Sequence, residues 1–505
     1  MEQHPSVAPA AVPTRVVVFT IGALLALRLC FDVFAAPLPD EAYYWLWGQH
    51  LALSYYDHPP LNAWLQRIAA AMFGWNIFSL RIVTWLTTAG MAIVIWQRTR
   101  QLGPEYVSGT TALFFATPIV FIFSTLAFPD HLVIFLVLLS AHWFARYVES
   151  GNGPDQRTAW LYGAAIALGF AGLAKYNAFL VGLGVAAAVL ATPELRRLLR
   201  DPNIYGAAAV AILMQWPVFY WNATNGMPSF RYNLADRLSW LGIDGLSNVA
   251  LLALALTATV GPMLLTPLYR FLGAAWRRDA TDALWTPLGF WVYGLTTAVF
   301  TGLCFFSFVQ YYWTIGAYPI FLTIALAFFR SRRAVASHLI YGLVCATLFT
   351  ANYTIVPLSA LAGRTDAESA LMFGWDEIAR RVVAASARTN AGLVAASDYR
   401  MAAQLAFAIR DPAVQAISAR QDQFDFWLQD GGGRQGAVAI ILTDDRYPLN
   451  DDVNARFASI ELIETFTIER FGLRLKQYRL YRGSSFISKG RTPLAAPQAS
   501  AIAFP

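Results

Sequence analysis

Residues 37–45 read Pro-Leu-Pro-Asp-Glu-Ala-Tyr-Tyr-Trp and directly follow the first long apolar segment of the chain. Asp40 and Glu41 are thus neighbouring carboxylates at the end of a segment suited to lipid. Adjacent acids repel each other, which indicates a nearby proton, metal ion or hydroxyl that offsets the repulsion. Helix capping is the alternative, because Asp40 after Pro39 could cap a helix while Glu41 supports the helix dipole. Capping needs only one acid, so the pair favours a functional role.

The composition around this stretch is that of a membrane protein. Of 505 residues, 57% are hydrophobic and only 13% are charged, which cannot cover a water-soluble globule of this size. We expect a mainly α, polytopic helix bundle with about eleven spans and a small C-terminal α/β domain. The first span is expected to be retained, since cleavage after Ala36 would leave the acidic pair at a free terminus. Apolar segments long enough to cross about 30 Å of hydrocarbon are 15–36, 79–97, 106–126, 130–148, 159–174, 178–192, 203–221, 248–269, 284–306, 312–330 and 335–357.

Arginine predicts the orientation of these spans. It collects in every second loop, and such loops are cytoplasmic by the positive-inside rule. The loops that carry the acidic pair, Lys175 and residues 222–248 then face outward. An odd number of crossings also places the C-terminal region outside, so we expect the active site and the C-terminal domain on the outer face of the membrane. The loop arginines account for most of the net charge of +6, which therefore gives no indication of nucleic-acid binding.

The chain divides into three predicted regions: a transmembrane domain at 1–360, a soluble α/β domain at 361–482 and a disordered tail at 483–505. Within the soluble domain we expect a helix at 375–385, buried strands at 392–397 and 437–442, and a hairpin at 461–481. The three cysteines lie in apolar spans and are interpreted as packing residues. No Walker or dinucleotide-binding glycine motif is present.

The first outer loop is expected to form two amphipathic helices, at 40–51 and 59–73, joined by the turn Ser-Tyr-Tyr-Asp-His-Pro-Pro-Leu at 54–61. Turn chemistry explains Asp57 and the prolines but does not require His58, which is a candidate substrate ligand or a hydrogen-bonded structural residue. Asp130 and His131 form a second Asp-His pair, for which an N-cap is the alternative explanation. Asp57, His58 and Asp130 could also hold a divalent metal ion, but their spacing does not demand one, so we assign no metal ligands.

Lysine usage is selective. Only three of the 37 basic residues are lysines, at positions 175, 476 and 489, and Lys175 alone lies in the membrane part. A cation at the outer end of a span is disfavoured unless an anion pairs with it. Snorkelling to lipid headgroups is one explanation, and a phosphate-bearing ligand is the preferred one. Arg231 and Arg237 in the aromatic fourth outer loop are further candidates for binding an anionic lipid or for pairing with the carboxylates of the first loop.

Several of these motifs occur in the same order in one family of bacterial membrane proteins. The chain resembles the integral-membrane glycosyltransferases that include the protein O-mannosyltransferases and the lipid A aminoarabinose transferase, with the type C glycosyltransferase fold. The similarity covers residues 35–320, and the C-terminal segments 374–377 and 396–402 resemble the domain of the bacterial branch. The motifs that carry the resemblance are Leu-Pro-Asp-Glu-Ala-Tyr-Tyr-Trp at 38–45, Tyr-Asp-His-Pro-Pro-Leu at 56–61, Phe-Pro-Asp at 128–130, Leu-Ala-Lys-Tyr at 173–176, Trp-Asn at 221–222, Ser-Phe at 229–230, Tyr-Tyr-Trp at 311–313 and Ala-Tyr-Pro at 317–319.

This resemblance implies a transferase that moves a sugar from a polyprenyl-phosphate donor to a hydroxyl or phosphate oxygen of an outer-leaflet acceptor. It also implies a location in the bacterial inner membrane, with the active site and the C-terminal domain on the periplasmic side. Asp40 would be the general base, with Glu41 beside it. In the aminoarabinose enzyme the first-loop turn has an acid followed by a lysine, whereas this chain has Asp57-His58, so phosphate binding there would depend on pH. The predicted site residues are Asp40, Glu41 and Asp130 for catalysis, and Asp57, His58, His131, Lys175, Tyr176, Arg231, Arg237, Tyr311 and Tyr312 for substrate binding.

The chemistry is consistent with this assignment. Polyprenyl phosphate is a good leaving group, so the reaction needs removal of an acceptor proton and stabilisation of the phosphate, without a nucleotide. Direct displacement inverts the anomeric centre, and we expect Asp40 across a cavity from Lys175. The alternative function is a lipid transporter or flippase without transfer chemistry, and a scaffolding protein is a third. We expect a monomer that contacts membrane lipids, with no nucleic-acid partner. The sugar stays open, as does the acceptor: lipid A is preferred over other glycolipids, a polysaccharide or a protein.

Overall fold

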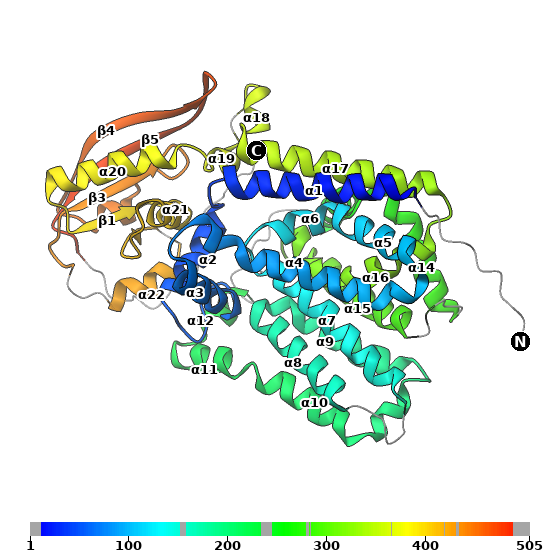
Figure 1. Cartoon of the computed structure of the whole chain (residues 1–505). Helices are drawn as coiled ribbons and strands as arrows, with labels where there is room; N and C mark the ends of the chain where they lie inside the picture. Colours follow the sequence, from blue (N-terminus) through cyan, green and yellow to red (C-terminus); the bar gives the residue numbers. More distant parts are fainter. Residues whose placement is uncertain are drawn as a thin grey trace, which may run out of the picture. The chain divides into compact units, whose positions relative to one another are not determined.

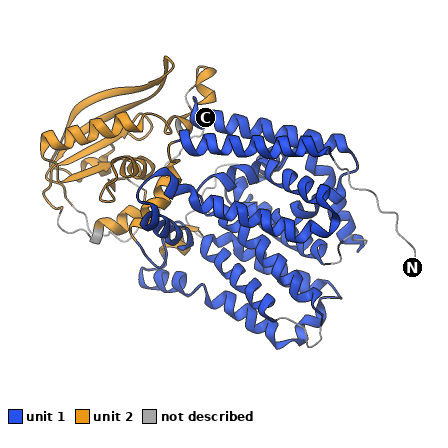
Figure 2. Cartoon of the chain, viewed as in Figure 1, with its two compact units in different colours: residues 1–35, 51–227, 240–355 blue, residues 36–50, 228–239, 356–505 orange. Residues whose placement is uncertain are grey.

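The computed structural model describes residues 12–151, 158–233, 245–278, 282, 284–364, 366–418, 420–430 and 434–487. It separates into two compact units (Figure 2). The first comprises residues 1–35, 51–227 and 240–355, and the second comprises residues 36–50, 228–239 and 356–505. The long C-terminal segment of the second unit begins at residue 356, close to the predicted domain boundary at 360. The second unit also contains two short segments from the predicted transmembrane domain. One of these segments carries the acidic pair.

The first unit is built from helices, which Figure 1 shows in sequence colours. Its α-helices are α1 (Thr14–Phe34), α3 (Leu61–Phe73), α4 (Ile77–Thr99), α5 (Pro104–Ala116), α6 (Pro118–Thr125), α7 (Asp130–Glu149), α8 (Thr158–Ala174), α9 (Phe179–Ala191), α10 (Pro202–Leu213), α11 (Trp216–Thr224), α13 (Gly245–Val260), α14 (Leu265–Arg277), α15 (Trp285–Leu303), α16 (Pro319–Ile324) and α17 (Arg332–Thr354). Short 3-10 helices are η1 (Arg100–Leu102), η2 (Tyr176–Ala178), η3 (Arg196–Arg200), η5 (Pro262–Leu264), η6 (Tyr311–Ala317) and η7 (Ala325–Phe328).

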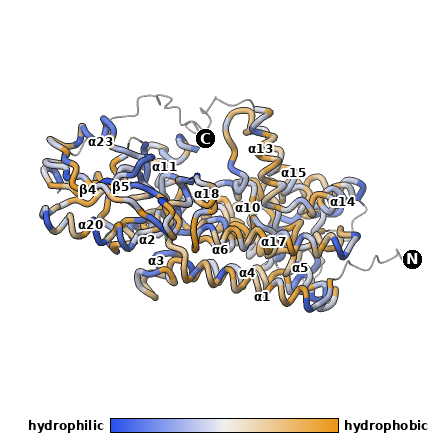
Figure 3. The backbone as a smooth tube through the Cα atoms, turned by 90° about the horizontal axis from the view of Figure 1, so that it is seen from above, coloured by the Kyte–Doolittle hydropathy of each residue, from blue (hydrophilic) through white to orange (hydrophobic). Residues whose placement is uncertain are grey.

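Within the described residues, five helices are long and apolar enough to cross a membrane, or up to eight if each of three bent pairs is one span. The predicted count of eleven is therefore not confirmed. The predicted fifth and sixth spans are shorter apolar helices, at Thr158–Ala174 and Tyr176–Ala191. The first unit also exposes large apolar side chains, including Phe19 at 69% and Leu86 at 65%, and its helices are predominantly hydrophobic in Figure 3. Such surface suits lipid, whereas soluble monomers rarely expose large apolar patches.

One bent pair shows how close packing shapes a span. Helices α5 and α6 meet at 74°, with Pro118 at the start of α6. Helix α17 approaches this bend so closely that a Cβ atom on Gly342 would lie 1.8 Å from the carbonyl oxygen of Ala116. His338 of α17 lies beside it, with its Nε2 3.2 Å from Oγ1 of Thr117. The close approach of α17 to this bend thus requires a residue without a side chain at position 342.

The loops of the first unit meet in two groups that match the predicted alternation. Arg98 bonds Glu149 at 2.6 Å and also pairs with Asp282, so three loops expected on the cytoplasmic side lie together. At other loops, Asn62 Nδ2 donates to the carbonyl oxygen of Ala127 at 3.2 Å, and both residues belong to regions expected outside. The grouping agrees with the predicted sides, and the orientation in a membrane stays a prediction.

The second unit is an α/β structure. Its sheet has the order β2-β1-β3-β5-β4, in which β1 pairs in parallel with β2 and β3, and the last three strands pair antiparallel. A buried apolar cluster that includes Leu393, Ile441 and Phe457 forms part of its core. Its elements are α2 (Pro39–Gln49), α12 (Pro228–Arg231), α18 (Leu358–Leu361), α19 (Ala367–Ala370), α20 (Trp375–Thr389), β1 (Leu393–Ala396), α21 (Tyr399–Ile409), β2 (Gln415–Ala416), α22 (Gln423–Asp430), β3 (Ala439–Asp444), α23 (Asp451–Asn454), β4 (Ser459–Arg470) and β5 (Leu473–Ser484).

The local predictions for this unit are largely confirmed. The helix expected at 375–385 is α20, the strands expected at 392–397 and 437–442 are β1 and β3, and the hairpin expected at 461–481 is β4–β5. Helix α21 and strand β2 were not predicted. The tail expected to begin at 483 overlaps the end of β5, and residues 488–505 lie outside the described part of the chain.

Candidate functional site

The acidic pair lies on α2, where the two carboxylates have different surroundings. Pro39 is the first helical residue and Leu38 is the N-cap, so Asp40 is not the cap that its sequence position suggested. Glu41 is fully buried and its Oε2 accepts the backbone N–H of Leu38 at 2.9 Å. This bond satisfies a donor that the helix start would otherwise leave unpaired. Asp40 is only partly buried, so it is the carboxylate of the pair with solvent access.

Helix α2 is anchored to the α/β part of the second unit by aromatic contacts. The ring of Tyr43 lies 4.9 Å from that of Tyr399 on α21 and 5.8 Å from that of Phe424 on α22, between centroids. The hydroxyl of Tyr43 also accepts the backbone N–H of Gln423 at 2.8 Å. Tyr43 is 2% exposed. These contacts hold the acid-bearing helix against the α/β part of the second unit.

The pKa of Tyr399, at the start of α21, depends on burial and on nearby charges that include Asp40. Burial raises the pKa of the Tyr399 phenol well above its ordinary value, and the negative charge of Asp40 raises it further. The cations Arg420 and Arg400 act in the opposite direction. Tyr399 therefore carries a neutral hydroxyl, which is influenced by the carboxylate of Asp40 and by the guanidinium groups of Arg420 and Arg400.

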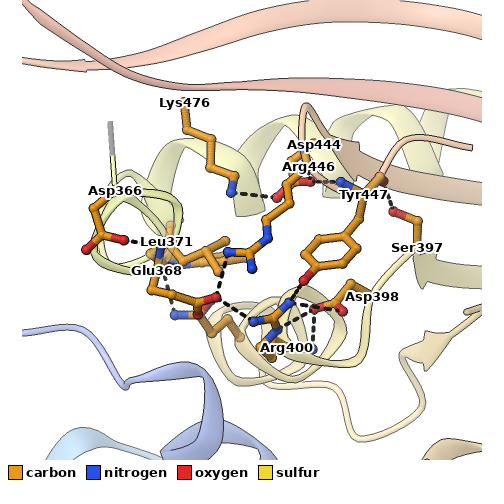
Figure 4. Close-up of polar contacts among 12 residues, drawn as sticks. Asp366, Glu368, Leu371, Ser397, Asp398, Arg400, Asp444, Arg446, Tyr447 and Lys476 are labelled. Atoms are coloured by element: carbon orange, nitrogen blue, oxygen red, sulfur yellow. Dashed lines mark hydrogen bonds and ion pairs between the residues drawn. The ribbon is translucent and has the colours of Figure 1, made fainter. Parts of the chain in front are cut away.

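The N-terminus of α21 is held by a network of charges at the carboxyl ends of β1 and β3 (Figure 4). Asp398 accepts the backbone N–H of Arg400 at 3.0 Å and its Nε at 2.9 Å. Arg400 and Arg446 both donate to Oε1 of Glu368, each at 2.7 Å. Arg400 also bonds the hydroxyl of Tyr447. These bonds fix the backbone that positions Tyr399.

Arg420, the other cation that acts on Tyr399, is exposed. Its Nη2 donates to the hydroxyl of Tyr232 at 2.8 Å. Its guanidinium lies 5.0 Å from the ring centroid of Tyr399 and 5.3 Å from that of Tyr232, within cation–π range. Tyr232 follows Arg231, which was predicted as a substrate ligand and is exposed. Arg237, the other predicted arginine, lies outside the described residues.

The first unit contains a buried ion pair between two predicted site residues. Lys175 Nζ bonds Oδ1 of Asp130 at 2.6 Å, and the residues are 4% and 1% exposed. Lys175 Nζ also lies 4.7 Å from the ring centroid of Tyr312. Asp130 is the first residue of α7, and Pro129 is the N-cap. The carboxylate of Asp130 supplies the paired anion that a buried lysine requires, and Asp130 is not the N-cap residue that its sequence position suggested.

His131 and the turn at 54–61 lie in the same unit. His131 is fully buried, with its Nδ1 2.9 Å from Oγ1 of Thr87 on α4. Asp57 is 7% exposed and His58 is partly buried. Tyr176 follows Lys175 at the start of η2, and the rings of Tyr311 and Tyr312 contact each other on η6 with centroids 5.6 Å apart. Among the described residues, no group of three or more His, Cys, Asp or Glu side chains could hold a metal ion.

The structure thus brings together part of the predicted set. It joins Lys175, Asp130 and Tyr312 in the first unit, while Asp40 and Glu41 belong to the second. The expected apposition of Asp40 and Lys175 across a cavity stays a prediction, because they lie in different units. Sequence reasoning missed Tyr232, Tyr399 and Arg420. Only the similarity of residues 396–402 to the C-terminal domain of the family drew attention to Tyr399.

Comparisons of the sequence and of the fold show which known proteins this chain is similar to. Residues 57–221 match the family described as dolichyl-phosphate-mannose-protein mannosyltransferase. The chain is 27% identical over 382 residues to lipid A galacturonosyltransferase RgtD of Rhizobium johnstonii, covering 74% of this chain and 77% of that protein. Its fold is similar to that of ArnT from Cupriavidus metallidurans bound to undecaprenyl phosphate, with a TM-score of 0.62 at 14% identity over 93% of this chain and 98% of the other. The apo state of ArnT matches with a TM-score of 0.60, covering 92% and 98% of the two chains, also at 14% identity.

Proposed function

We propose that this chain is an integral-membrane glycosyltransferase with the type C glycosyltransferase fold and a polyprenyl-phosphate-sugar donor. The proposed acceptor is lipid A or another glycolipid of the outer leaflet of the bacterial inner membrane. The similarity to a lipid A galacturonosyltransferase and to an ArnT structure that holds undecaprenyl phosphate supports these two substrate classes.

The single observation that carries the proposal is the buried Lys175–Asp130 pair beneath Tyr312. Charges inside a membrane bundle are costly and are retained mainly at functional sites. An ammonium is a compact charge suited to phosphate oxygens. We assign Lys175 to the donor phosphate, with Asp130 holding the ammonium in place and Tyr312 covering it. Asp57, His58, Tyr176 and Tyr311 are further proposed contacts of the donor.

The proposed reaction is a direct displacement. Asp40 accepts the proton of the acceptor hydroxyl. At the same time the oxygen of that hydroxyl forms a bond to the anomeric carbon of the donor sugar. The bond from that carbon to the phosphate oxygen breaks, and polyprenyl phosphate leaves with the electron pair. The configuration at the anomeric carbon is inverted. Glu41 positions the base, because its bond to the N–H of Leu38 organises the first turn of α2.

The test uses the purified full chain in lipid nanodiscs, with undecaprenyl phosphate carrying galacturonic acid, aminoarabinose or mannose, and lipid A as acceptor. We expect transfer of at least one of these sugars, detected by mass spectrometry. Removing a general base typically costs 10²–10⁴-fold, so Asp40→Asn should lower kcat by about that factor. Asp376→Asn, an exposed carboxylate at the start of α20, is the matched control and should leave kcat unchanged.

Two outcomes would contradict the proposal. Full activity of Asp40→Asn would remove Asp40 as the base. The second outcome needs a separate assay, in which the wild-type protein is placed in liposomes with a fluorescent lipid-linked sugar. Movement of this lipid across the liposome membrane, together with absence of transfer for every donor and acceptor, would instead support the alternative of a lipid transporter.

A further inference from the structure

The charged network of Figure 4 lies where the connections of the sheet diverge. Strands β1 and β3 are parallel neighbours in the order β2-β1-β3-β5-β4. The chain continues from β1 to β2 on one side, and from β3 toward β4 and β5 on the other. In open α/β sheets, ligands bind outside the carboxyl ends of the strands at such a point. The residues that follow β1 and β3 therefore occupy the position at which this fold binds ligands.

Hydrogen bonds between the two loops give this position a fixed shape. The hydroxyl of Ser397, after β1, donates to the carbonyl oxygen of Tyr447, after β3. Oδ1 of Asp444, at the end of β3, accepts the backbone N–H groups of Arg446 and Tyr447 at 3.1 and 2.6 Å. Oδ2 of Asp444 pairs with Lys476 at 2.7 Å, and the two residues are 0% and 3% exposed. One of the three lysines of the chain thus anchors the acid that shapes this loop.

Two guanidinium groups converge on one oxygen atom at this position. Arg400 and Arg446 each donate from Nη1 to Oε1 of Glu368 at 2.7 Å, as Figure 4 shows. Arg400 also bonds Asp398 at 2.9 Å and the hydroxyl of Tyr447, which fixes its side chain. Two like charges repel each other unless an anion lies between them. The position therefore requires an oxyanion, and here the carboxylate of Glu368 supplies it.

The carboxylate of Glu368 can be replaced without disturbing its surroundings. The side chain of Glu368 is 48% exposed and that of Arg446 is 31% exposed, and ion pairs at such exposure contribute little to stability. Helix α19 does not depend on this carboxylate, because its N-cap Asp366 accepts the backbone N–H groups of Glu368 and Ser369. A change of the Glu368 rotamer is therefore enough to open the position.

Competition with Glu368 indicates the chemical class of the ligand. Glu368 belongs to the same chain, so its effective concentration is of the order of millimolar or higher. A ligand with a single carboxylate carries the same charge as Glu368 and gains no advantage over it. A phosphate monoester carries a charge of about −1.5 to −2 at pH 7 and has three acceptor oxygens. It can bridge the two guanidinium groups more strongly than a carboxylate does.

We propose that Arg400 and Arg446 form a binding site for a phosphate monoester group, which Glu368 fills until the ligand replaces its carboxylate. The phosphate belongs either to a small soluble molecule or to a lipid headgroup. All residues of the site belong to the second unit, and the inference does not rest on the proposed function.

The test is isothermal titration calorimetry of the full chain in phosphatidylcholine nanodiscs with glycerol 3-phosphate. Charge-assisted hydrogen bonds correspond to about a 10- to 100-fold change in affinity, so Arg446→Gln should weaken binding by about that factor. Glu368→Gln removes the competing carboxylate and should strengthen binding by about 3- to 10-fold. The matched controls are Arg388→Gln near the end of α20 and Glu461→Gln on β4, both at exposed positions, and they should leave the affinity unchanged.

A second set of titrations distinguishes the two sources of the phosphate. Phosphatidic acid has a phosphate monoester headgroup, whereas phosphatidylglycerol is anionic with a phosphate diester. Loss of glycerol 3-phosphate binding in nanodiscs with phosphatidic acid, but not in those with phosphatidylglycerol, would support the site and assign it to a lipid headgroup. Binding that persists in both would support the site and assign it to a soluble ligand.

Three results would overturn the inference. They are absence of glycerol 3-phosphate binding by both the wild type and Glu368→Gln, equal affinity of these two proteins, and unchanged affinity of Arg446→Gln. Thermal unfolding checks that each variant is folded, and Glu368→Gln keeps the test decisive if Arg446→Gln does not fold. A network that serves only stability predicts a lower Tm for both variants and no phosphate binding. Sugar transfer is not measured, so failure of the proposed function would leave this result unaffected.

Discussion

The roles assigned to Lys175 and Asp130 in the first unit can be tested quantitatively through the stability of variants. Asp130→Asn leaves an ammonium that is 4% exposed without its anionic partner. Breaking a buried ion pair on one side costs about 3–5 kcal/mol. The cost has an upper limit, because the remaining group can become neutral. At pH 7 this takes about 4.6 kcal/mol for a lysine of ordinary pKa ~10.4, and about 4.2 kcal/mol for an aspartate of ordinary pKa ~3.9.

We therefore expect Asp130→Asn and Lys175→Met each to lower the free energy of unfolding by about 3–4 kcal/mol, within the limits set by neutralisation. The double variant removes both charges, so its loss should be smaller than the sum by at least about 2 kcal/mol. Unfolding in mixed detergent micelles, followed by tryptophan fluorescence, measures these values. Activity should stay absent in the double variant, because the donor phosphate would lack its ammonium.

The pH dependence makes the test sharper. Lowering the pH from 7 to 5 eases protonation of Asp130 in Lys175→Met by about 2.7 kcal/mol, so the destabilisation relative to wild type should fall by up to that amount. Strictly additive losses from the two single variants, or a double variant with normal transfer, would refute the assigned roles of this pair.

Two further predictions concern stability. Nε2 of His50 lies 2.9 Å from the carbonyl oxygen of Pro412, and burial lowers the pKa of His50 below its ordinary value. As the pH falls, the unfolded chain therefore binds the proton before the folded chain does, so Tm should fall as the pH drops below about 6.5. A flat Tm profile that His50→Gln leaves unchanged would contradict this. A Cβ atom on Gly342 would lie 1.8 Å from the carbonyl oxygen of Ala116, whereas one on Gly22 would meet nothing within 4 Å. Gly342→Ala should therefore lower Tm strongly, and Gly22→Ala should leave Tm unchanged. Equal Tm values for the two variants would refute the packing argument.

Local sequence features predicted most of the secondary structure. The helices expected at 40–51 and 59–73 are α2 (Pro39–Gln49) and α3 (Leu61–Phe73), and the C-terminal hairpin is also confirmed. Periodicity and turn residues act over a few positions, so they can be recognised without knowledge of the fold. The count of spans was less predictable, because bends such as the 74° bend between α5 and α6 break long apolar segments into shorter helices.

The candidate site shows a similar division. The unusual placement of Lys175, Asp40 and Glu41 could be seen in the sequence, since charges in an apolar chain are conspicuous. The partners of these residues could not, because Lys175 and Asp130 are 45 positions apart and Arg420 is separated from Tyr232 by 188. Two readings of Asp130, cap or site residue, were equally compatible with its neighbours in the chain.

By itself, the sequence determined that this is a membrane protein of many helices with a small α/β domain, because apolar length and charge content are properties of short segments. Only the tertiary structure decided that Glu41 caps α2 while Asp40 keeps solvent access, that Asp130 neutralises Lys175, and that Arg420 stacks on Tyr399. Burial and charge pairing depend on which distant residues meet, and that information exists only after the chain has folded.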